Sequence, residues 1–528
     1  MSWNRFLRTT SWFSLFQGVW TEDSTGDIPF DKTLTQSLVG KGLREVKGAS
    51  YLQRATNVHG PGVARILRKR PGFSKINTTA VNSAGVWTGF VHLGEIADKF
   101  YGTASIVAGT HNIYDFASDP PVAVAAGTNF TVGADNLITP LLFTSGTATG
   151  AIFVSRLRDL PQFINGSGTR SDFTIAGTGL TSLKPAIGEI FNQRAIWGDV
   201  DFDGTVYDDR LYWTDIRDGN LVTDPTTQFL SFETRLKDKV RGIHKLSDIC
   251  VIGKLNNIFT MVATQDEATP FIVQEEAAGQ TRGVVSHQAM VEAGQRLFWM
   301  GNSNIHSIDQ NFQIWDWADA IQPTIRGLND ARREFAVSGI DADRSLVLFN
   351  VSDGSDTTND LTIALNYKTG ALYFWDLRRN AYGIRAVSDE IRLVGGGYVG
   401  FGYYELTGTA GALDDATAVI GADVITPKYW VNYGTKAKIP YVALTCDPVG
   451  TESLTVTYAL DDEDILTSPR TPAGSPYAVT GSTHKVFLVP IKAFAERIQL
   501  RIYNNTADAV YNVKAIGLPG LAMQPVSS

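Results

Sequence analysis

The best candidate for an ion-binding motif is the run Asp199-Val200-Asp201-Phe202-Asp203-Gly204. Carboxylates at alternate positions before a glycine are typical of the start of a calcium-binding loop, in which several oxygens converge on one ion. The twelfth position of such a loop requires a bidentate glutamate, and here that position is Arg210. We therefore favour an acidic hairpin turn before the strand at Leu211, with calcium binding as the alternative, and we predict no cofactor.

Glycoside hydrolysis is a second candidate chemistry, because it needs two carboxyl groups that flank the scissile bond. Acids near predicted strand ends are the candidates for such a pair. They are Glu189, Asp215, Asp316 and Asp376. Acids are common at strand ends, so their positions alone do not favour an enzyme. The chain also lacks a nucleophile elbow, a phosphate-binding loop and a dinucleotide fingerprint. We predict a protein that is not an enzyme.

The histidines and cysteines do not have the spacing of metal ligands. Cys250 and Cys446 are far apart, and Cys250 is flanked by apolar residues, so we predict two buried thiols. No two histidines have the His-x-x-x-His spacing of a metal site. The histidines are His59, His92, His111, His244, His287, His306 and His484.

A basic run, which contains Arg65, Arg68, Lys69 and Arg70, is the candidate for contacts with phosphate. Short basic runs are more often a solvated strand face, and a contact with acids of another subunit is a third interpretation. The net charge of −8 argues against a general nucleic-acid binder that wraps duplex DNA from outside. It does not exclude a protein through which nucleic acid passes.

Short strands separated by polar turns recur along the chain, most clearly in residues 286–317. Here Ala289–Ala293, Arg296–Met300 and Ile305–Ile308 are separated by turns of glycine, asparagine, glutamine and serine. Such a pattern predicts a β-meander. Because its strands carry aromatic residues, the meander needs a neighbour on both faces, as a propeller blade has.

A weak internal repeat supports this architecture. Residues 210–213 read Arg-Leu-Tyr-Trp and residues 296–299 read Arg-Leu-Phe-Trp, and residues 363–376 form a hairpin with a Lys-Thr-Gly turn. At roughly 50–60 residues per blade, residues 51–425 would hold about six or seven blades. The aromatic residues predicted to be buried between blades are Trp213, Phe298, Trp299 and Trp375.

Composition and pattern together divide the chain into three parts. The 528 residues are too many for one core, and 50 glycines against 5 methionines favour tight turns over long helices. Residues 1–50 are rich in aromatics, and we favour an arm that packs on a partner subunit over an edge strand of the chain's own domain. Residues 426–528 contain cleanly alternating strands, which predict an antiparallel β-sandwich.

We thus predict an all-β protein with an N-terminal arm at 1–50, a β-propeller at 51–425 and a C-terminal β-sandwich at 426–528. No run of about 18 apolar residues predicts a membrane span. The first residues also lack the apolar core and cleavage site of a signal peptide.

Four motifs in this order, followed by a terminal sandwich, carry a family resemblance. They are Arg-Lys-Arg-Pro-Gly-Phe (68–73), Leu-Tyr-Trp-Thr-Asp (211–215), Arg-Leu-Phe-Trp-Met-Gly with Ile-Trp-Asp (296–316), and Asn-Tyr-Lys-Thr-Gly with Phe-Trp-Asp (366–376). The chain resembles the β-propeller nozzle proteins of short-tailed bacteriophages, also called tail tubular or packaged-DNA-stabilisation proteins.

The resemblance implies a homo-hexamer in the virion tail, assembled in the host cytoplasm. Its partners would be the portal-adaptor ring above it and other tail proteins, such as fibres or a needle. The hexamer would extend the channel for double-stranded DNA, help to retain the packaged genome and pass it during ejection. Arg65, Arg68, Lys69 and Arg70 are the candidates for the level at which DNA is held.

Two other classes of function stay open. One is a tail-associated propeller glycan hydrolase, which should have convergent acids at the centre of the propeller. The other is a glycan-binding adhesin that uses the terminal sandwich, which should present exposed aromatic platforms.

Overall fold

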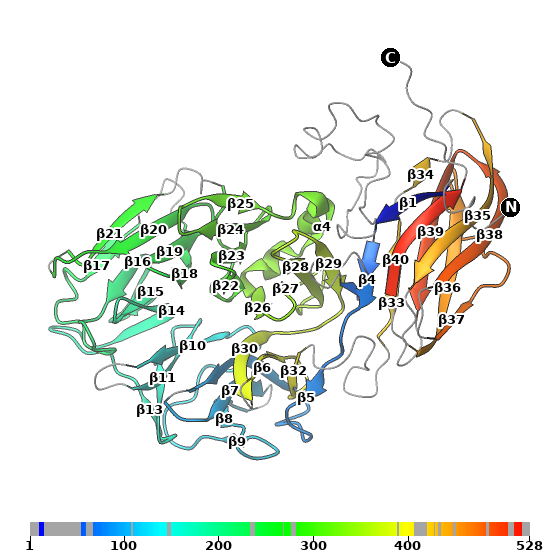
Figure 1. Ribbon diagram of the computed structural model, residues 1–528. Helices are drawn as coiled ribbons and strands as arrows, with labels where there is room; N and C mark the ends of the chain where they lie inside the picture. The colour runs from blue at the N-terminus through cyan, green and yellow to red at the C-terminus, as the bar shows by residue number, and fades with distance from the viewer. Residues whose placement is uncertain are drawn as a thin grey trace.

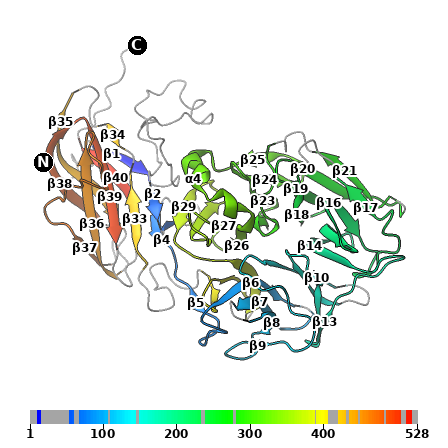
Figure 2. The same cartoon turned by 180° about the vertical axis from the view of Figure 1, so that it is seen from behind.

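The computed structural model describes residues 10–14, 54–56, 58–59, 67–94, 96–106, 109–144, 149–232, 238–267, 269–275, 281–387, 390–405, 420–426, 428–430, 435–446, 450–481, 485–504 and 512–519. These residues form a ring of four-stranded sheets with a β-sandwich beside it (Figure 1). The same two parts are seen from behind in Figure 2.

Six four-stranded antiparallel sheets and the first four strands of a ten-stranded sheet form the ring, so the described residues contain a seven-bladed propeller. This confirms the predicted all-β class and falls within the predicted number of blades. Blade 1 consists of β6 (Gly85–His92), β7 (Phe100–Ile106), β8 (His111–Asp115) and β9 (Val122–Ala123). Blade 2 consists of β10 (Ile138–Phe143), β11 (Gly150–Ser155), β12 (Gln162–Asn165) and β13 (Arg170–Asp172). Blade 3 consists of β14 (Leu183–Phe191), β15 (Arg194–Phe202), β16 (Thr205–Trp213) and β17 (Phe229–Ser231).

The remaining blades complete the circle. Blade 4 consists of β18 (Val240–Leu246), β19 (Ile249–Lys254), β20 (Ile258–Ala263) and β21 (Phe271–Glu275). Blade 5 consists of β22 (Met290–Ala293), β23 (Arg296–Met300), β24 (Ile305–Asp309) and β25 (Ile314–Asp316). Blade 6 consists of β26 (Val337–Asp341), β27 (Leu346–Val351), β28 (Leu361–Asn366) and β29 (Leu372–Trp375). Blade 7 consists of β30 (Ala381–Val387), β31 (Glu390–Gly396), β32 (Gly402–Tyr404) and β5 (Ser74–Lys75).

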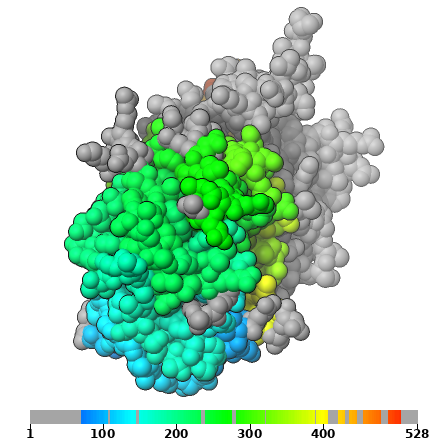
Figure 3. All heavy atoms as spheres, turned by 90° about the vertical axis from the view of Figure 1, so that its left-hand side faces the viewer, coloured from blue at the N-terminus to red at the C-terminus, as the bar shows by residue number. Residues whose placement is uncertain are grey.

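Short helices occur before and after blade 5. They are η2 (His287–Ala289), η3 (Asp319–Ile321), α4 (Gln322–Gly327) and η4 (Asp330–Phe335). No helix in the described part of the chain is long and apolar enough to cross a membrane. Figure 3 shows the rim of the ring, where blue and cyan early blades lie below the green blades that follow them.

Tight turns make the meanders possible. The turns Asn192-Gln193, Asp203-Gly204 and Gly294-Gln295 each have two central residues with positive φ, between 48° and 85°. Two-residue turns of this kind match the right-handed twist of the strands that they join. They connect β14 to β15, β15 to β16, and β22 to β23.

The outermost strand of blade 7 comes from the N-terminal side of the chain. Tyr403 and Tyr404 of β32 pair with Lys75 and Ser74 of β5. Residues from both ends of the propeller thus share one sheet, and this pairing closes the ring. Closure protects the backbone groups that an open sheet edge would leave unpaired.

The sandwich is built from both ends of the chain. One of its sheets has the order β3-β4-β40-β35-β38, with β1 also paired to β40. The other continues from blade 6 as β29-β2-β33-β39-β36-β37, with β34 also paired to β39. The bounds are β1 (Thr10–Ser14), β2 (Arg54–Thr56), β3 (Val58–His59), β4 (Leu67–Lys69), β33 (Ala422–Ile425), β34 (Tyr429–Trp430), β35 (Ala437–Cys446), β36 (Gly450–Leu460), β37 (Tyr477–Gly481), β38 (Lys485–Ala495), β39 (Arg497–Asn504) and β40 (Asn512–Pro519).

This pairing shows that the domain boundaries differ from the predicted ones. Strands β2, β3, β4 and β33 lie within the range 51–425 that was predicted as propeller, but they pair with strands of the sandwich. These strands have two to four residues each, too few for a periodic pattern, and their partners are far away in the sequence. Of the predicted arm at 1–50, the described residues Thr10–Ser14 form a strand on β40, and the rest lies outside the described residues.

The aromatic core confirms the predicted burial. Trp213 is 7% exposed, Phe298 and Trp299 are fully buried, and Trp375 is 1% exposed. Phe298 packs in a cluster with residues of blade 6, whereas its neighbour Trp299 packs with residues of blade 4. Adjacent residues of β23 thus contact the two flanking blades, as alternation along a strand requires. The two cysteines, Cys250 and Cys446, are also buried and free, as predicted.

Candidate functional site

The first strand of every blade faces the axis of the ring, and together these strands line a cavity of about 750 Å³. All seven blades contribute to its wall. Representative residues are Thr88, Thr139, Glu189, His244, Gln288, Ser338 and Tyr382. Apolar side chains, among them Phe90, Leu142, Ile190 and Ile384, make up much of the remaining surface. A concave, largely apolar wall with a few polar groups is the usual form of a binding site in proteins.

Glu189 is the one carboxylate among the described residues that line this cavity. Its oxygens accept hydrogen bonds from the backbone N–H groups of Ile190 at 2.8 Å and Lys245 at 3.2 Å. The His244 ring nitrogen Nδ1 lies 3.9 Å from the same carboxylate. Glycoside hydrolysis needs two carboxyl groups within reach of one bond, and the cavity wall offers a single one.

The other three candidate acids lie in different blades and take part in local contacts. Asp215 accepts hydrogen bonds from Thr223 and from Gln228, the latter at 2.7 Å. Asp376 pairs with Arg70 at 3.1 Å, close to the junction with the sandwich. Together with Asp316 and Glu189, these acids form no convergent pair, so the expected hydrolase geometry is not found at the centre of the propeller.

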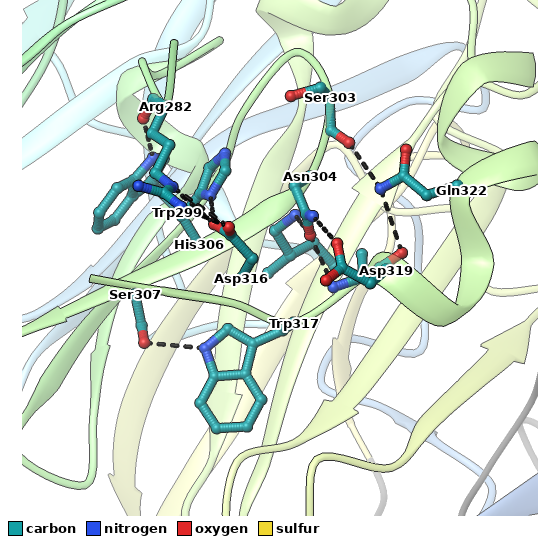
Figure 4. A network of polar contacts seen from close by, with 12 residues as sticks. Arg282, Trp299, Ser303, Asn304, His306, Ser307, Asp316, Trp317, Asp319 and Gln322 are labelled. Carbon is teal, nitrogen blue, oxygen red and sulfur yellow. Dashed lines mark hydrogen bonds and ion pairs between the residues drawn. The ribbon is translucent and has the colours of Figure 1, made fainter. Parts of the chain in front are cut away.

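Asp316 belongs to a hydrogen-bonded network at the outer part of blade 5 (Figure 4). Its carboxylate accepts a 2.7 Å hydrogen bond from His306 Nδ1 and two bonds from Arg282. The hydrogen bond from His306 is the main reason why the pKa of Asp316 lies well below its usual value. Trp299 donates its indole N–H to the carbonyl of Arg282 at 2.9 Å. The network therefore joins the segment before the blade to its outer strands, which is a structural role.

The three aspartates of the expected ion-binding motif point to different partners. Asp199 pairs with Arg158. Asp201 accepts from the backbone N–H of Gly204 at 2.8 Å, and Asp203 accepts from Thr181 and Ser182. Because the carboxylates do not converge, the favoured hairpin turn describes this segment and the calcium alternative does not fit it. Among the described residues, no group of three or more histidine, cysteine or acidic side chains is arranged to hold a metal.

The described part of the basic run, residues 68–70, lies at the junction of propeller and sandwich. Arg70 is 2% exposed and donates to the carbonyl of Pro71 and to Asp376, so it is unsuited to hold DNA on a channel wall. Arg68 and Lys69 lie in β4, and Arg65 lies outside the described residues. The expectation that all four cations act at one level of a DNA channel is therefore wrong for Arg70, because its charge is buried against an acid.

A charged group that local sequence spacing does not reveal lies at one side of the central cavity. We call it the mouth cluster, and its members are Arg156, Arg158, Asp199, Lys239, Arg241 and Glu334. Glu334 Oε2 lies 2.7 Å from both Arg156 Nη2 and Arg241 Nη1. Asp199 pairs with Arg158 and lies 4.0 Å from Lys239 Nζ. The six side chains are between 7% and 34% exposed.

A β-bulge positions the acid at the centre of this cluster. The register of β15 against β16 shifts between Gly198 and Val200, and the intervening Asp199 has a φ of 50°. A bulge of this kind turns a side chain out of the regular alternation. Asp199 is consequently directed toward the cations of blades 2 and 4 rather than along its own sheet.

The charges of the mouth cluster shift one another's pKa values. Burial raises the pKa of Glu334, but the cations Arg156 and Arg241 outweigh it and hold that pKa below its usual value. Burial lowers the pKa of Lys239, Asp199 opposes this, and the neighbouring Arg241 adds to the lowering. The cations of the mouth cluster therefore create a positive potential, and the cluster is partly desolvated.

Two buried histidines predict a loss of stability in mild acid. Burial lowers the pKa of His111 to about 4 and that of His287 to about 3, from an ordinary value of 6.5. Between these values the unfolded chain binds more protons than the folded chain, so stability is complete above pH 6.5 and falls as the pH decreases. At pH 5 we expect each histidine to cost roughly 2 kcal/mol of unfolding free energy.

The measurement is urea unfolding at pH 7.5 and at pH 5. His287→Gln keeps an acceptor for the N–H of Ile243, which His287 Nδ1 accepts at 3.3 Å, and removes the titration. We expect this variant to lose about 2 kcal/mol less than the wild type between the two pH values. An equal loss in both proteins would show that His287 is not titrating.

Comparisons with known proteins add distant structural similarities only. No protein-family model matches the chain, and no curated protein matches it in sequence. Similar solved structures include virginiamycin B lyase from Staphylococcus aureus, with 10% identity over 62% of this chain and 96% of that one, at a TM-score of 0.35. The WD40 domain of Neurospora crassa Pan2 is 7% identical over 62% of this chain and 96% of that domain, at a TM-score of 0.32. PorZ is a surface component of the type-IX secretion system of Porphyromonas gingivalis. It is 9% identical over 69% of this chain and 44% of PorZ, at a TM-score of 0.33.

Proposed function

We propose that the chain is a structural subunit of the tail nozzle of a short-tailed bacteriophage. In this proposal it forms a homo-hexameric ring in the virion, below the portal-adaptor ring and in contact with other tail proteins. The ring extends the channel for double-stranded DNA, helps to retain the genome and lets it pass during ejection. The order of motifs in the sequence is the origin of this proposal.

The structural observation that supports it best is the ten-stranded sheet that continues from blade 6 into the sandwich. Thr56 of β2 pairs with Phe374 of β29 on one side, and Arg54–Thr56 pair with Asp423–Ile425 of β33 on the other. Domains joined only by a small polar interface move relative to each other. A shared hydrogen-bonded sheet opposes such motion, which suits a ring subunit that bears load between its neighbours.

The chemistry of the central cavity favours this class of function over a hydrolase. Glu189 stands without a second carboxylate among the described lining residues, and Asp215, Asp316 and Asp376 take part in local hydrogen bonds. A conduit needs no reacting group. With a net charge of −8, the chain as a whole has more acidic than basic side chains, which permits a channel wall that does not slow a sliding polyanion.

Electron microscopy of the purified protein with its portal-adaptor ring tests the assembly. We expect a six-fold ring with an axial hole, and we expect virions without this protein to leak DNA or to lack a complete tail. Virions that keep their DNA, assemble a full tail and fail only at attachment to the host would favour the adhesin instead. Release of sugars from host polysaccharide by the purified protein would favour the hydrolase.

Binding of free duplex DNA is a second test. Because the net charge is −8, we expect the isolated protein to bind a short duplex with a Kd weaker than about 10 µM at physiological salt. Fluorescence anisotropy with a labelled duplex measures this. A Kd in the nanomolar range would contradict a conduit with low friction, since each strong phosphate contact would have to be broken as the DNA moves.

A further inference from the structure

A small cavity of about 30 Å³ lies beside the mouth cluster. Its described lining includes Arg156, Asp199, Lys239, Arg241 and Glu334. Ser286 and His287, which precede blade 5, complete the polar part of the wall. Thr139, His287 and Gln288 line both this cavity and the larger central one, so the small cavity is a side pocket at the mouth of the propeller.

The charges around the side pocket do not balance. Among the residues that line it, three cations, Arg156, Lys239 and Arg241, face two carboxylates, which leaves an excess of one positive charge. Each carboxylate is already shared, Glu334 by two arginines and Asp199 by Arg158 and Lys239. Partly desolvated cations in excess are unfavourable unless an anion accompanies them. The geometry therefore leaves a place for one more negative group.

Hydrogen-bond donors surround that place. The Nε atom of Arg241 is buried and has no hydrogen-bond partner. The side chain of Ser286 lines the pocket and does not cap η2. His287 accepts a hydrogen bond at Nδ1 from the N–H of Ile243. Its proton is consequently on Nε2, which makes the ring a neutral donor.

We propose that the mouth of the propeller binds a small tetrahedral oxyanion of the phosphate class, held by Lys239, Arg241 and Ser286. Arginine forks and ammonium groups are the usual partners of phosphate oxygens. The pocket has room for about two water molecules, which suits one phosphate group and excludes a DNA duplex. Such binding does not depend on the nozzle function, since it needs only the folded propeller.

Calorimetric titration of the full-length protein with inorganic phosphate at constant ionic strength tests the proposal. We expect saturable one-site binding, and we expect Lys239→Gln and Arg241→Gln each to weaken it about tenfold through loss of a charge-assisted contact. The matched control is Arg392→Gln, whose exposed guanidinium pairs with Glu390 at the start of β31 in blade 7. Equal affinities in the control and in both site variants would overturn the proposal, as would the absence of saturable binding.

A substitution that is expected to increase the affinity for phosphate distinguishes a role in binding from a loss of folding. Glu334 competes for Arg156 and Arg241, so Glu334→Gln should free both guanidinium groups and tighten phosphate binding about fivefold or more. A destabilised variant cannot gain affinity in this way. Weaker or unchanged binding by a Glu334→Gln protein with a wild-type melting curve would contradict the placement of the oxyanion.

The source of the phosphate group is distinguished by competition. A short single-stranded oligonucleotide with a 5′-phosphate and the same oligonucleotide without it are each added to the phosphate complex. Displacement by the phosphorylated strand alone would identify a terminal phosphate as a ligand, and displacement by neither would identify the free ion. Equal displacement by both strands would instead show general attraction to the backbone and would overturn a site of this size.

Discussion

Replacing Trp299 by alanine is expected to lower the free energy of unfolding by roughly 3–5 kcal/mol. The indole is fully buried between blades 4 and 5, where it packs against Leu246 and Val251. Its N–H donates to the carbonyl of Arg282, so the substitution also leaves a backbone acceptor without its partner. Chemical denaturation followed by circular dichroism gives the value.

The control is Phe494→Ala, which removes an aromatic ring that is 64% exposed on the sandwich. Surface substitutions of this kind usually change stability by about 0.5 kcal/mol or less. If the two variants lost similar amounts, the packing of Trp299 between the blades could not be the source of its contribution.

The second large effect is expected at the ion pair inside blade 7. Arg379 and Glu405 are 5% and 0% exposed, and the guanidinium donates to both carboxylate oxygens. It also lies 4.5 Å from the ring of Phe73 and 4.4 Å from that of Tyr403. Arg379→Met should cost roughly 3–5 kcal/mol, because it leaves the Glu405 carboxylate buried without a counter-charge.

A double-mutant cycle checks this cause. Combining Arg379→Met with Glu405→Leu removes both charges, and we expect the double variant to regain much of the lost stability. The exposed pair of Arg392 and Glu390 in the same blade provides the comparison, and its loss should cost at most about 1 kcal/mol. A double variant as unstable as the sum of the single variants would show that the two side chains act independently.

The propeller could be predicted because its signals are local. Residues 286–317 contain strands of three to five residues, tight turns and adjacent aromatics, and Phe298 and Trp299 face opposite neighbours. Burial on both faces follows from two large apolar residues in succession on one strand. The sandwich could also be predicted, because the apolar residues Ile498, Leu500 and Ile502 alternate with polar ones in β39.

The domain boundary could not be predicted, because it depends on pairing between distant segments. Nothing in the three residues of β2 indicates that they join β29 to β33. The turn Asn192-Gln193 contains no glycine, although both residues have positive φ. In these places tertiary contacts decide the conformation, and local preference carries little information.

The mouth cluster could not be predicted from the sequence for a related reason. Two of its arginines follow β11, Lys239 precedes β18 and Arg241 lies within it. Its acids come from a bulge in β15 and from η4, and only the closed ring brings these groups together. The aspartate motif at 199–203 contributes one member, Asp199, to the mouth cluster. Asp199 forms an ion pair with Arg158 and does not act as a ligand of calcium. The bulge points its side chain in a different direction from those of Asp201 and Asp203.

The pairing of β5 with β32, and of β1 and β4 with β40, has a consequence for biosynthesis. During translation β5 is synthesised long before β32. This outer strand of blade 7 therefore has no partner while the other six blades are translated. Contacts between such distant segments form slowly, because the chain must first be ordered over a long loop. Until then β1, β4 and β5 lack these partners and can pair with other chains. The same strands that make the finished molecule resistant to opening thus make its nascent form dependent on protection until translation is nearly complete.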